Sequence, residues 1–197
     1  MTLLVEGSTI TNDLDKANAL NNQFVSVFTQ ENTSTIPSIP GPSYPDMDSI
    51  DITTEGITRL LSNLNPYKAS GPDGITTRFL KEFALEIAPC LTILFQASLN
   101  QGIVPDDWKK AFVVPVFKKG DRSSPANYRP ISLTSVVCKM LEHIISSSIY
   151  LHLDKHKIFT DQQHGFRSRR SCETQLIGTI NDFATTLNHS GQVDAIF

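Results

Sequence analysis

Lysines and an arginine flank a short turn near the middle of the chain, where they could bind an anion together. The apolar, β-branched run 111–117 ends in Lys118, Lys119 and a Gly-Asp turn, and the chain returns through a proline-bounded segment that carries Arg129. This pattern predicts a β-hairpin whose two arms bring cations to one place. Lysine provides a mobile charge and arginine a planar fork that matches phosphate oxygens, so a triphosphate or a nucleic-acid backbone is the expected ligand. An exposed hairpin with ordinary surface charges is the alternative.

A second basic block lies further along the chain, before Ser171, which we expect to cap a helix. Its arginines would meet phosphates at this helix start, where free backbone N–H groups also favour anions. Gly165 would allow a nucleic acid to come close to the backbone, because glycine has no side chain. A solvated basic loop is the alternative for the arginines, and packing is favoured over base stacking for Phe166. The candidate contacts are Gln163, Gly165, Phe166, Arg167, Arg169 and Arg170.

The distribution of charge also points to a polyanion. The net charge is −3, but residues 109–170 contain twelve Lys or Arg and only four Asp or Glu, a balance of +8. A basic block inside an acidic chain is a candidate polyanion surface, with a solvated face as the alternative. An apolar fraction of 40% fits a globular protein, and no apolar run of about 18 residues predicts a membrane span.

No metal site is expected from the side chains that usually bind metals. The three cysteines, Cys90, Cys138 and Cys172, form no CxxC pair and fit a reducing, intracellular setting, with nucleus and cytoplasm both left open. His152 and His156 are four residues apart, but no third ligand accompanies them. The adjacent Asp106-Asp107 is interpreted as a helix or turn charge.

A turn-rich loop over residues 68–75 is harder to interpret chemically. Lys68 could touch backbone phosphate, but the sequence does not decide this. Gly71 and Gly74 allow positive φ, and we expect Asp73 to be a turn or cap residue rather than a catalytic one.

The elements that must position these residues are mainly helical. In chain order, we expect a helix from Asn12 to about Gln30, a Pro-, Ser- and Thr-rich linker, a helix over 57–64 and a helix capped by Thr76 or Thr77. Pro89 would interrupt that helix, and Gly102 would end its continuation. There follow the hairpin, a helix capped by Thr134 or Ser135, a helix after Ser171 and the first half of a strand over 193–197.

Ordered sequence blocks resemble the N-terminal half of the reverse transcriptase domain of non-LTR, LINE-like (jockey-like) retrotransposons. The blocks are Lys-x-x-Gly-Pro-Asp-Gly-Ile (68–75), Trp108, Val-Pro-Val-Phe-Lys-Lys-Gly-Asp (114–121), Asn-Tyr-Arg-Pro-Ile-Ser-Leu (127–133) and Gln-His-Gly-Phe-Arg (163–167). The resemblance covers roughly residues 12–197. It implies an α+β fold with the mainly helical fingers and partial palm of a right-hand polymerase. The implied parts are an N-terminal helical connection (1–30), a linker (31–52) and a partial reverse transcriptase domain (53–197).

The resemblance also implies ligands and roles. Lys118 and Arg129 would bind the triphosphate of the incoming deoxynucleotide, and the block 163–167 would lie against the template. Lys68 and Lys119 would add nucleic-acid contacts. The partners would be an RNA template, a DNA primer and deoxynucleotide triphosphates, without a membrane.

The family's catalytic groups are expected to lie outside these residues. Palm aspartates of such polymerases hold Mg²⁺. Their first block would follow a segment like 193–197, and Asp194 is not the expected aspartate. We therefore expect a truncated reverse transcriptase fragment, cut before the catalytic palm strands, with no catalytic or metal-binding residue and no polymerase activity alone. The alternative is a catalytically inactive nucleic-acid-binding remnant or a host-retained interaction protein. An unfinished palm would expose apolar surface and favour self-association.

Overall fold

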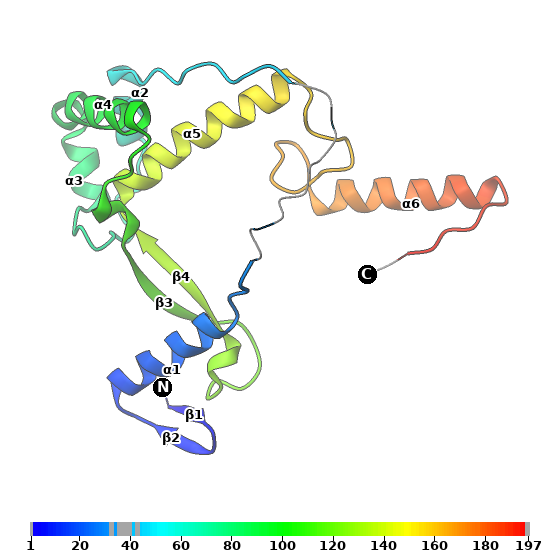
Figure 1. Cartoon of the computed structure of the whole chain (residues 1–197), viewed down its shortest axis with the longest axis horizontal. Helices are drawn as coiled ribbons and strands as arrows, with labels where there is room; N and C mark the ends of the chain where they lie inside the picture. The colour runs from blue at the N-terminus through cyan, green and yellow to red at the C-terminus, as the bar shows by residue number, and fades with distance from the viewer. Residues whose placement is uncertain (1, 32–33, 35–40, 42–43, 196–197) are drawn as a thin grey trace. The chain divides into compact units, whose positions relative to one another are not determined.

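The computed structural model describes residues 2–31, 34, 41 and 44–195, and these residues form an α+β structure (Figure 1). Within them there are six α-helices and two antiparallel sheets of two strands each. The α+β class predicted from the sequence is therefore confirmed. The chain divides into two compact units, one of Met1–Pro42 with Asp48–Ser147 and one of Ser43–Met47 with Ser148–Phe197.

The first unit begins with a small hairpin followed by a helix. Strands β1 (Leu3–Val5) and β2 (Ser8–Ile10) pair antiparallel, and helix α1 (Asp13–Ser26) follows. The Asn12 side chain accepts hydrogen bonds from the backbone N–H groups of Leu14 and Asp15, which confirms the predicted cap. The sequence did not predict β1 and β2, because three-residue strands carry too short a pattern.

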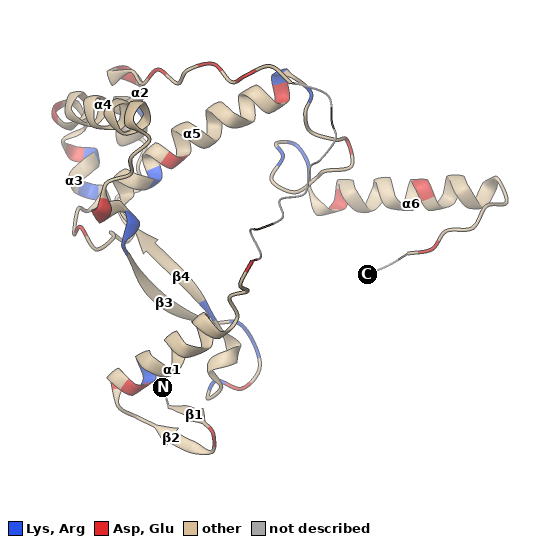
Figure 2. Ribbon diagram, viewed as in Figure 1, with Lys and Arg blue, Asp and Glu red and all other residues tan. Residues whose placement is uncertain are grey.

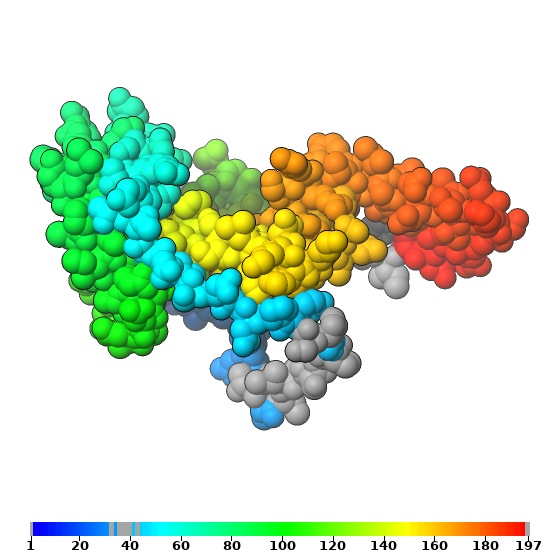
Figure 3. Space-filling view, turned by 90° about the horizontal axis from the view of Figure 1, so that it is seen from above, coloured from blue at the N-terminus to red at the C-terminus, as the bar shows by residue number. Residues whose placement is uncertain are grey.

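Three helices, together with the start of the later helix α5 (Val136–Lys155), build the larger hydrophobic core of this unit. The three helices are α2 (Thr54–Ser62), α3 (Thr77–Glu82) and α4 (Ala84–Gln101). Figure 3 shows α2 (cyan) lying against α4 (green), and the 3₁₀ turn η1 (Asp106–Lys109) adds Trp108. The rings of Phe95 and Trp108 meet edge to face at 5.6 Å. The buried side chains of this cluster include Ile57, Leu61, Leu80, Ala88, Leu91, Val137 and Leu141.

The predicted helix break at Pro89 is wrong. Helix α4 continues through Pro89, and the break lies at Phe83, whose φ of −105° and ψ of 33° separate α3 from α4. A proline inside a helix leaves the carbonyl four residues earlier without a partner. Here that carbonyl belongs to Leu85, an exposed residue, so water can hydrate it. The predicted stop at Gly102 is confirmed by its left-handed φ of 63°.

A long central hairpin leads out of this core. Strand β3 (Ala111–Phe117) pairs antiparallel with β4 (Tyr128–Thr134), and the connecting loop contains the 3₁₀ turn η2 (Pro125–Asn127). Strand β3 has the bounds that the sequence predicted. Helix α5 (Val136–Lys155) follows, and its first turns return to the larger core.

The loop 68–75 packs against the junction of β4 and α5. A Cβ on Gly71 would lie 2.5 Å from the backbone N of Ser135, so Gly71 is needed for close approach rather than for positive φ. Gly74 has the predicted positive φ, 68°. The Asp73 carboxylate accepts from the Ile75 N–H at 3.2 Å, which confirms it as a turn residue.

The second unit contains the end of α5, a loop and helix α6 (Cys172–Asn188). Ser171 caps α6 in a capping box with Thr174, as predicted for Ser171. Residues 193–195 form no strand, contrary to prediction, because no other strand in the described part of the chain pairs with them; residues 196–197 lie outside it. Part of the predicted linker 31–52, namely residues 32–33, 35–40 and 42–43, lies outside the described residues, and its other residues form no helix or strand. Of the helices described, none has the length and apolar character needed to cross a membrane.

Candidate nucleic-acid interface

The register of the central hairpin places its two predicted phosphate ligands on one face. Side chains alternate between the faces of a strand, and Val116 pairs directly with Arg129. Lys118, two residues after Val116, therefore lies on the same face as Arg129 and diagonal to it. Phe117 and Tyr128 occupy the opposite face. The arrangement brings a lysine and an arginine from different arms to one exposed surface, as the sequence predicted.

The loop beyond these strands has a defined shape. The backbone N–H of Lys118 donates to the Asn127 carbonyl at 2.8 Å, which extends the ladder by one pair. Gly120 has φ of 89°, and its neighbour Asp121 accepts from the Ser123 N–H at 2.8 Å. That hydrogen bond lowers the pKa of Asp121. The predicted Gly-Asp turn is thus confirmed.

The cations of the hairpin have no ion-pair partner in the part of the chain that the structure describes. No salt bridge within the described residues involves Lys118, Lys119 or Arg129, and all three are exposed. Figure 2 shows basic residues (blue) along the loop that joins β3 and β4. Unpaired cations attract phosphate without first breaking another contact.

Sequence reasoning missed Arg122 in this loop. Its guanidinium lies 4.5 Å from the centre of the Phe117 ring, a cation–π contact. The signal available was its position, two residues after Gly120 in a loop that already carried two lysines.

Lys68 lies at a groove elsewhere in the first unit. The groove has a volume of about 510 Å³ and is lined by Lys68, Lys139 and His143, with no carboxylate in its wall. The sequence did not single out Lys139 and His143, although four-residue spacing on one helix places both on one face. Large apolar side chains form much of the wall: Leu60, Leu64, Leu133, Val136 and Met140.

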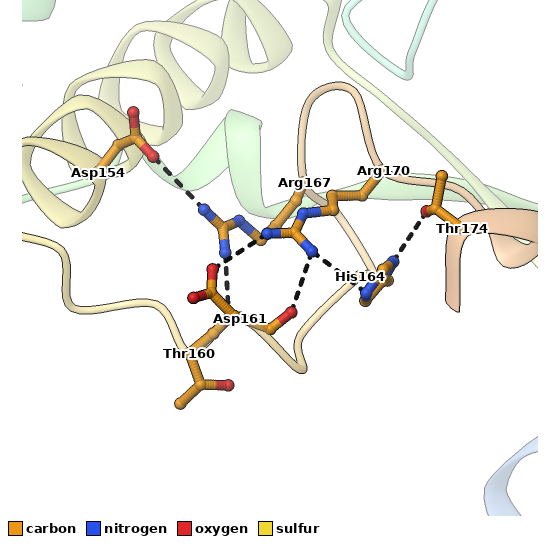
Figure 4. Close-up of polar contacts among 7 residues, drawn as sticks. All are labelled: Asp154, Thr160, Asp161, His164, Arg167, Arg170 and Thr174. Carbon is orange, nitrogen blue, oxygen red and sulfur yellow. Dashed lines mark hydrogen bonds and ion pairs between the residues drawn. The ribbon is translucent and has the colours of Figure 1, made fainter. Parts of the chain in front are cut away.

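In the second unit, the Arg167 side chain is held by contacts with neighbouring residues of the chain (Figure 4). Its Nη1 donates to the Thr160 carbonyl at 3.0 Å, and its Nη2 lies 3.6 Å from an Asp154 carboxylate oxygen. The guanidinium also lies 4.9 Å from the centre of the Phe159 ring, and the side chain is only 17% exposed. Arg167 therefore holds the loop, and its contact with the template stays a prediction.

Arg170 is held by a second set of contacts (Figure 4). It donates to the backbone carbonyl and the carboxylate of Asp161, at 3.0 and 3.1 Å. Its Nη1 also lies 3.2 Å from His164 Nε2, and His164 Nδ1 lies 2.8 Å from Thr174 Oγ1. Arginine can only donate, so Nε2 is the acceptor in a hydrogen bond between the two, and Nδ1 faces the Thr174 hydroxyl. This chain of contacts ties the loop to the first turn of α6.

Phe166 and Arg169 project from the same loop into solvent. Phe166 is 94% exposed, so the prediction that its ring packs against the protein is wrong. Both residues have positive φ, 59° and 62°, and each directly precedes an anchored arginine, Phe166 before Arg167 and Arg169 before Arg170. Gly165 has open space around its Cα, and Gln163 is exposed. Their contacts with phosphates or bases stay predictions.

The remaining candidate metal ligands have other partners. Asp106 and Asp107 pair with Lys109 and Lys110 at 2.8 and 2.9 Å, which confirms that they are turn charges. The rings of His152 and His156 lie 4.6 Å apart, but no group of three or more His, Cys, Asp or Glu suited to a metal occurs among the described residues.

An α+β chain with exposed cations on a central hairpin has the features of a polyanion-binding protein, and comparison with known proteins narrows the class. The chain is 27% identical over 199 residues, 97% of its length, to the probable RNA-directed DNA polymerase from transposon BS of Drosophila melanogaster. It is 28% identical over 131 residues, 66% of its length, to the RNA-directed DNA polymerase from mobile element jockey of the same species. The same identity and coverage relate it to the probable RNA-directed DNA polymerase from the Drosophila melanogaster X-element.

These relatives confirm the predicted resemblance to the reverse transcriptases of non-LTR retrotransposons. The chain spans 22% of the length of the transposon BS polymerase and 14% of the jockey and X-element polymerases. No protein-family model matches the chain.

Proposed function

We propose that this chain is the nucleotide- and template-contacting part of an RNA-directed DNA polymerase of a non-LTR retrotransposon, comprising the fingers and the start of the palm of a right-hand fold. The observation that carries the proposal is the hairpin register, which places Lys118 and Arg129 on one exposed face. The related polymerases support the reaction class, the addition of deoxynucleotides to a primer on an RNA template.

In this proposal the two cations have distinct tasks. Arg129 extends from a strand and would hold two phosphate oxygens of the incoming deoxynucleotide with its planar fork. Lys118 lies at the strand end and would add a mobile charge to the same triphosphate. Lys119 and Lys68 would contact nucleic-acid backbone. Arg169 would reach the template strand, while Arg167 and Arg170 would keep the loop in shape.

Magnesium ions are expected in a complete polymerase of this kind, where they neutralise charge on the reacting phosphates. The side chains of the described residues do not fit such a site, because no three potential ligands gather. The 197 residues also contain neither a Leu-Asp-Phe-Ser-Lys-Ala-like block nor an Ala-Asp-Asp block. We therefore expect no primer extension by these residues alone, and reproducible magnesium-dependent extension by a clean preparation would contradict this expectation.

Calorimetric titration with a deoxynucleotide triphosphate tests the nucleotide site. Lys118→Ala and Arg129→Ala should each weaken binding by about tenfold, the effect of losing one charge-assisted contact. Lys110→Ala is the matched control, because Lys110 lies just before the other end of β3 and already pairs with Asp107. Equal affinities for the unmodified chain and the three variants would reject the proposed site.

A nucleic-acid-binding protein without catalysis is the second candidate. The pair of exposed residues in the second unit, Phe166 and Arg169, favours it, since an aromatic ring and a cation together suit a single strand. Binding to a single-stranded RNA that falls steeply with salt, without measurable triphosphate binding, would support this candidate over the first.

Self-association belongs to the same proposal. Four apolar side chains of α6 are exposed: Leu176, Ile177, Ile180 and Leu187. Such a stripe on a helix usually covers another surface. Sedimentation velocity over a range of protein concentrations should show a rising average mass, and a constant monomer mass would contradict it.

A further inference from the structure

A second, smaller hydrophobic cluster lies at the far end of the central hairpin. It contains the buried side chains Leu3, Leu20 and Tyr128. Partly buried Ile10, Ala19, Phe24 and Phe117 pack around it. The cluster therefore joins β1, β2 and α1 to the ends of β3 and β4, as the proximity of α1 to the hairpin in Figure 1 also shows.

Polar contacts fix the loop to the same cluster. The Leu4 backbone N–H donates to the Ser123 carbonyl at 2.8 Å. The Tyr128 hydroxyl donates to the Arg122 carbonyl at 2.7 Å, and the Tyr128 ring meets Phe117 edge to face at 5.6 Å. The loop between the two proposed phosphate ligands is thus held by the N-terminal segment as well as by its own strands.

This cluster and the phosphate-binding face are on opposite sides of the same ribbon. Phe117 and Tyr128 are the immediate sequence neighbours of Lys118 and Arg129, and alternation directs the two pairs to opposite faces. Packing that fixes the first pair therefore fixes the direction in which the second pair projects. A preorganised pair of cations binds an anion more tightly than a mobile pair, because less conformational entropy is lost on binding.

We propose that the N-terminal segment β1–β2–α1 is a brace for the phosphate-binding hairpin, and that Leu20 and Tyr128 are positioning residues for Lys118 and Arg129. This inference rests on the proposed triphosphate site. It assigns to residues 3–26 a role in ligand affinity that goes beyond connecting parts of the chain.

The test uses the full 197-residue chain and inorganic tripolyphosphate in calorimetric titrations. Leu20→Ala should weaken binding by about tenfold, and Tyr128→Phe, which keeps the ring but removes the hydroxyl, by about threefold. Leu14→Ala is the matched control on the same helix, because Leu14 is 69% exposed whereas Leu20 is 6% exposed. It should bind like the unmodified chain.

A separate signal distinguishes positioning from general loss of structure. Trp108 is the sole tryptophan and lies in the larger core, so its fluorescence during urea unfolding reports on that core. The brace is supported if Tyr128→Phe keeps the Trp108 transition but loses affinity. It is overturned if Leu20→Ala and Tyr128→Phe bind like the unmodified chain while Lys118→Ala loses binding. If Lys118→Ala and Arg129→Ala also leave binding unchanged, the proposed triphosphate site fails, and the brace fails with it.

Discussion

Pro115 lies directly opposite Pro130 in the β3–β4 ribbon. The Lys118 N–H donates to the Asn127 carbonyl, so Lys118 and Asn127 form a hydrogen-bonded pair of the ladder. In an antiparallel ladder hydrogen-bonded and non-hydrogen-bonded pairs alternate, and counting back from Lys118 makes Pro115 and Pro130 a non-hydrogen-bonded pair. At such a pair the backbone N–H positions face outward. Both outer edges of the ribbon therefore lack a donor at their centre, so a further strand cannot add a continuous ladder.

Replacing both prolines should allow the edge strands of two molecules to pair. The double variant Pro115→Val, Pro130→Val restores a donor to each outer edge and raises β propensity. We expect concentration-dependent dimers or larger species by size-exclusion chromatography with light scattering. Pro125→Val makes the same chemical change in η2, outside both strands, and should leave the mass distribution unaltered. A monomeric double variant would show that the prolines do not protect the edges.

Substitutions should distinguish the anchored Arg167 from the exposed Arg169 in the second unit. Arg167→Ala removes a charged hydrogen bond to a carbonyl and a cation–π contact, and should destabilise the loop locally by about 1–3 kcal/mol. Hydrogen exchange of the amides in 159–170 should accelerate accordingly. Arg169→Ala should leave exchange unchanged and weaken single-stranded RNA binding, since Arg169 is exposed. Equal exchange rates for both variants would contradict the division of roles.

Gly71 should tolerate no side chain. The Cβ of Gly71→Ala would lie 2.5 Å from the Ser135 N, against backbone that cannot move aside easily. Overpacking of this kind costs about 1–3 kcal/mol, measured as a lower urea midpoint of Trp108 fluorescence. Gly165→Ala is the contrasting variant, because open space surrounds its Cα. A Gly71→Ala protein as stable as the unmodified chain would show that the loop can move away from β4.

The three cysteines should differ in reactivity. Burial, followed by the neighbouring Glu142 carboxylate, raises the pKa of the Cys138 thiol to about 11. The thiolate is the nucleophile, so at pH 8 iodoacetamide should label the exposed Cys90 and Cys172 but spare Cys138. In urea all three should react. Rapid labelling of Cys138 in the folded chain would contradict its burial.

The raised pKa of Cys138 also determines the direction in which the stability of the chain changes with pH. The folded state keeps the Cys138 proton to higher pH than the unfolded state does. The contribution to stability is complete below the unfolded pKa and is lost as pH rises through about 11. The urea midpoint of the unmodified chain should fall over this range more than that of Cys138→Ala. If the urea midpoints of the two proteins fell in parallel with rising pH, the pKa of Cys138 would have no effect on stability.

Local rules predicted the features that depend on adjacent residues. Asn12 and Ser171 cap their helices because a side-chain oxygen reaches an N–H two or three residues away. Strand β3 ends where its β-branched run gives way to Lys118. The hairpin face also followed, since a turn and a period of two determine which side chains share a side.

The features that sequence reasoning missed depend on distant contacts. Continuation of α4 through Pro89 requires that the orphaned Leu85 carbonyl face water, which only the tertiary structure decides. Arg167 has Asp154 and Phe159 as partners, so a residue singled out for phosphate contact also has a structural role that its sequence position did not reveal. Phe166 was expected to pack, but no part of the described chain covers its side chain, which is 94% exposed.

The two hydrophobic clusters lie at opposite ends of one ribbon, and this separation has a mechanical consequence. Each strand has seven residues, so the ribbon is about 24 Å long at ~3.4 Å per residue. If it pivots at the larger core, a rotation of about 10° moves its tip by ~4 Å, more than the length of a hydrogen bond. The ribbon is then a lever, and small repacking around Trp108 would be magnified at Lys118 and Arg129.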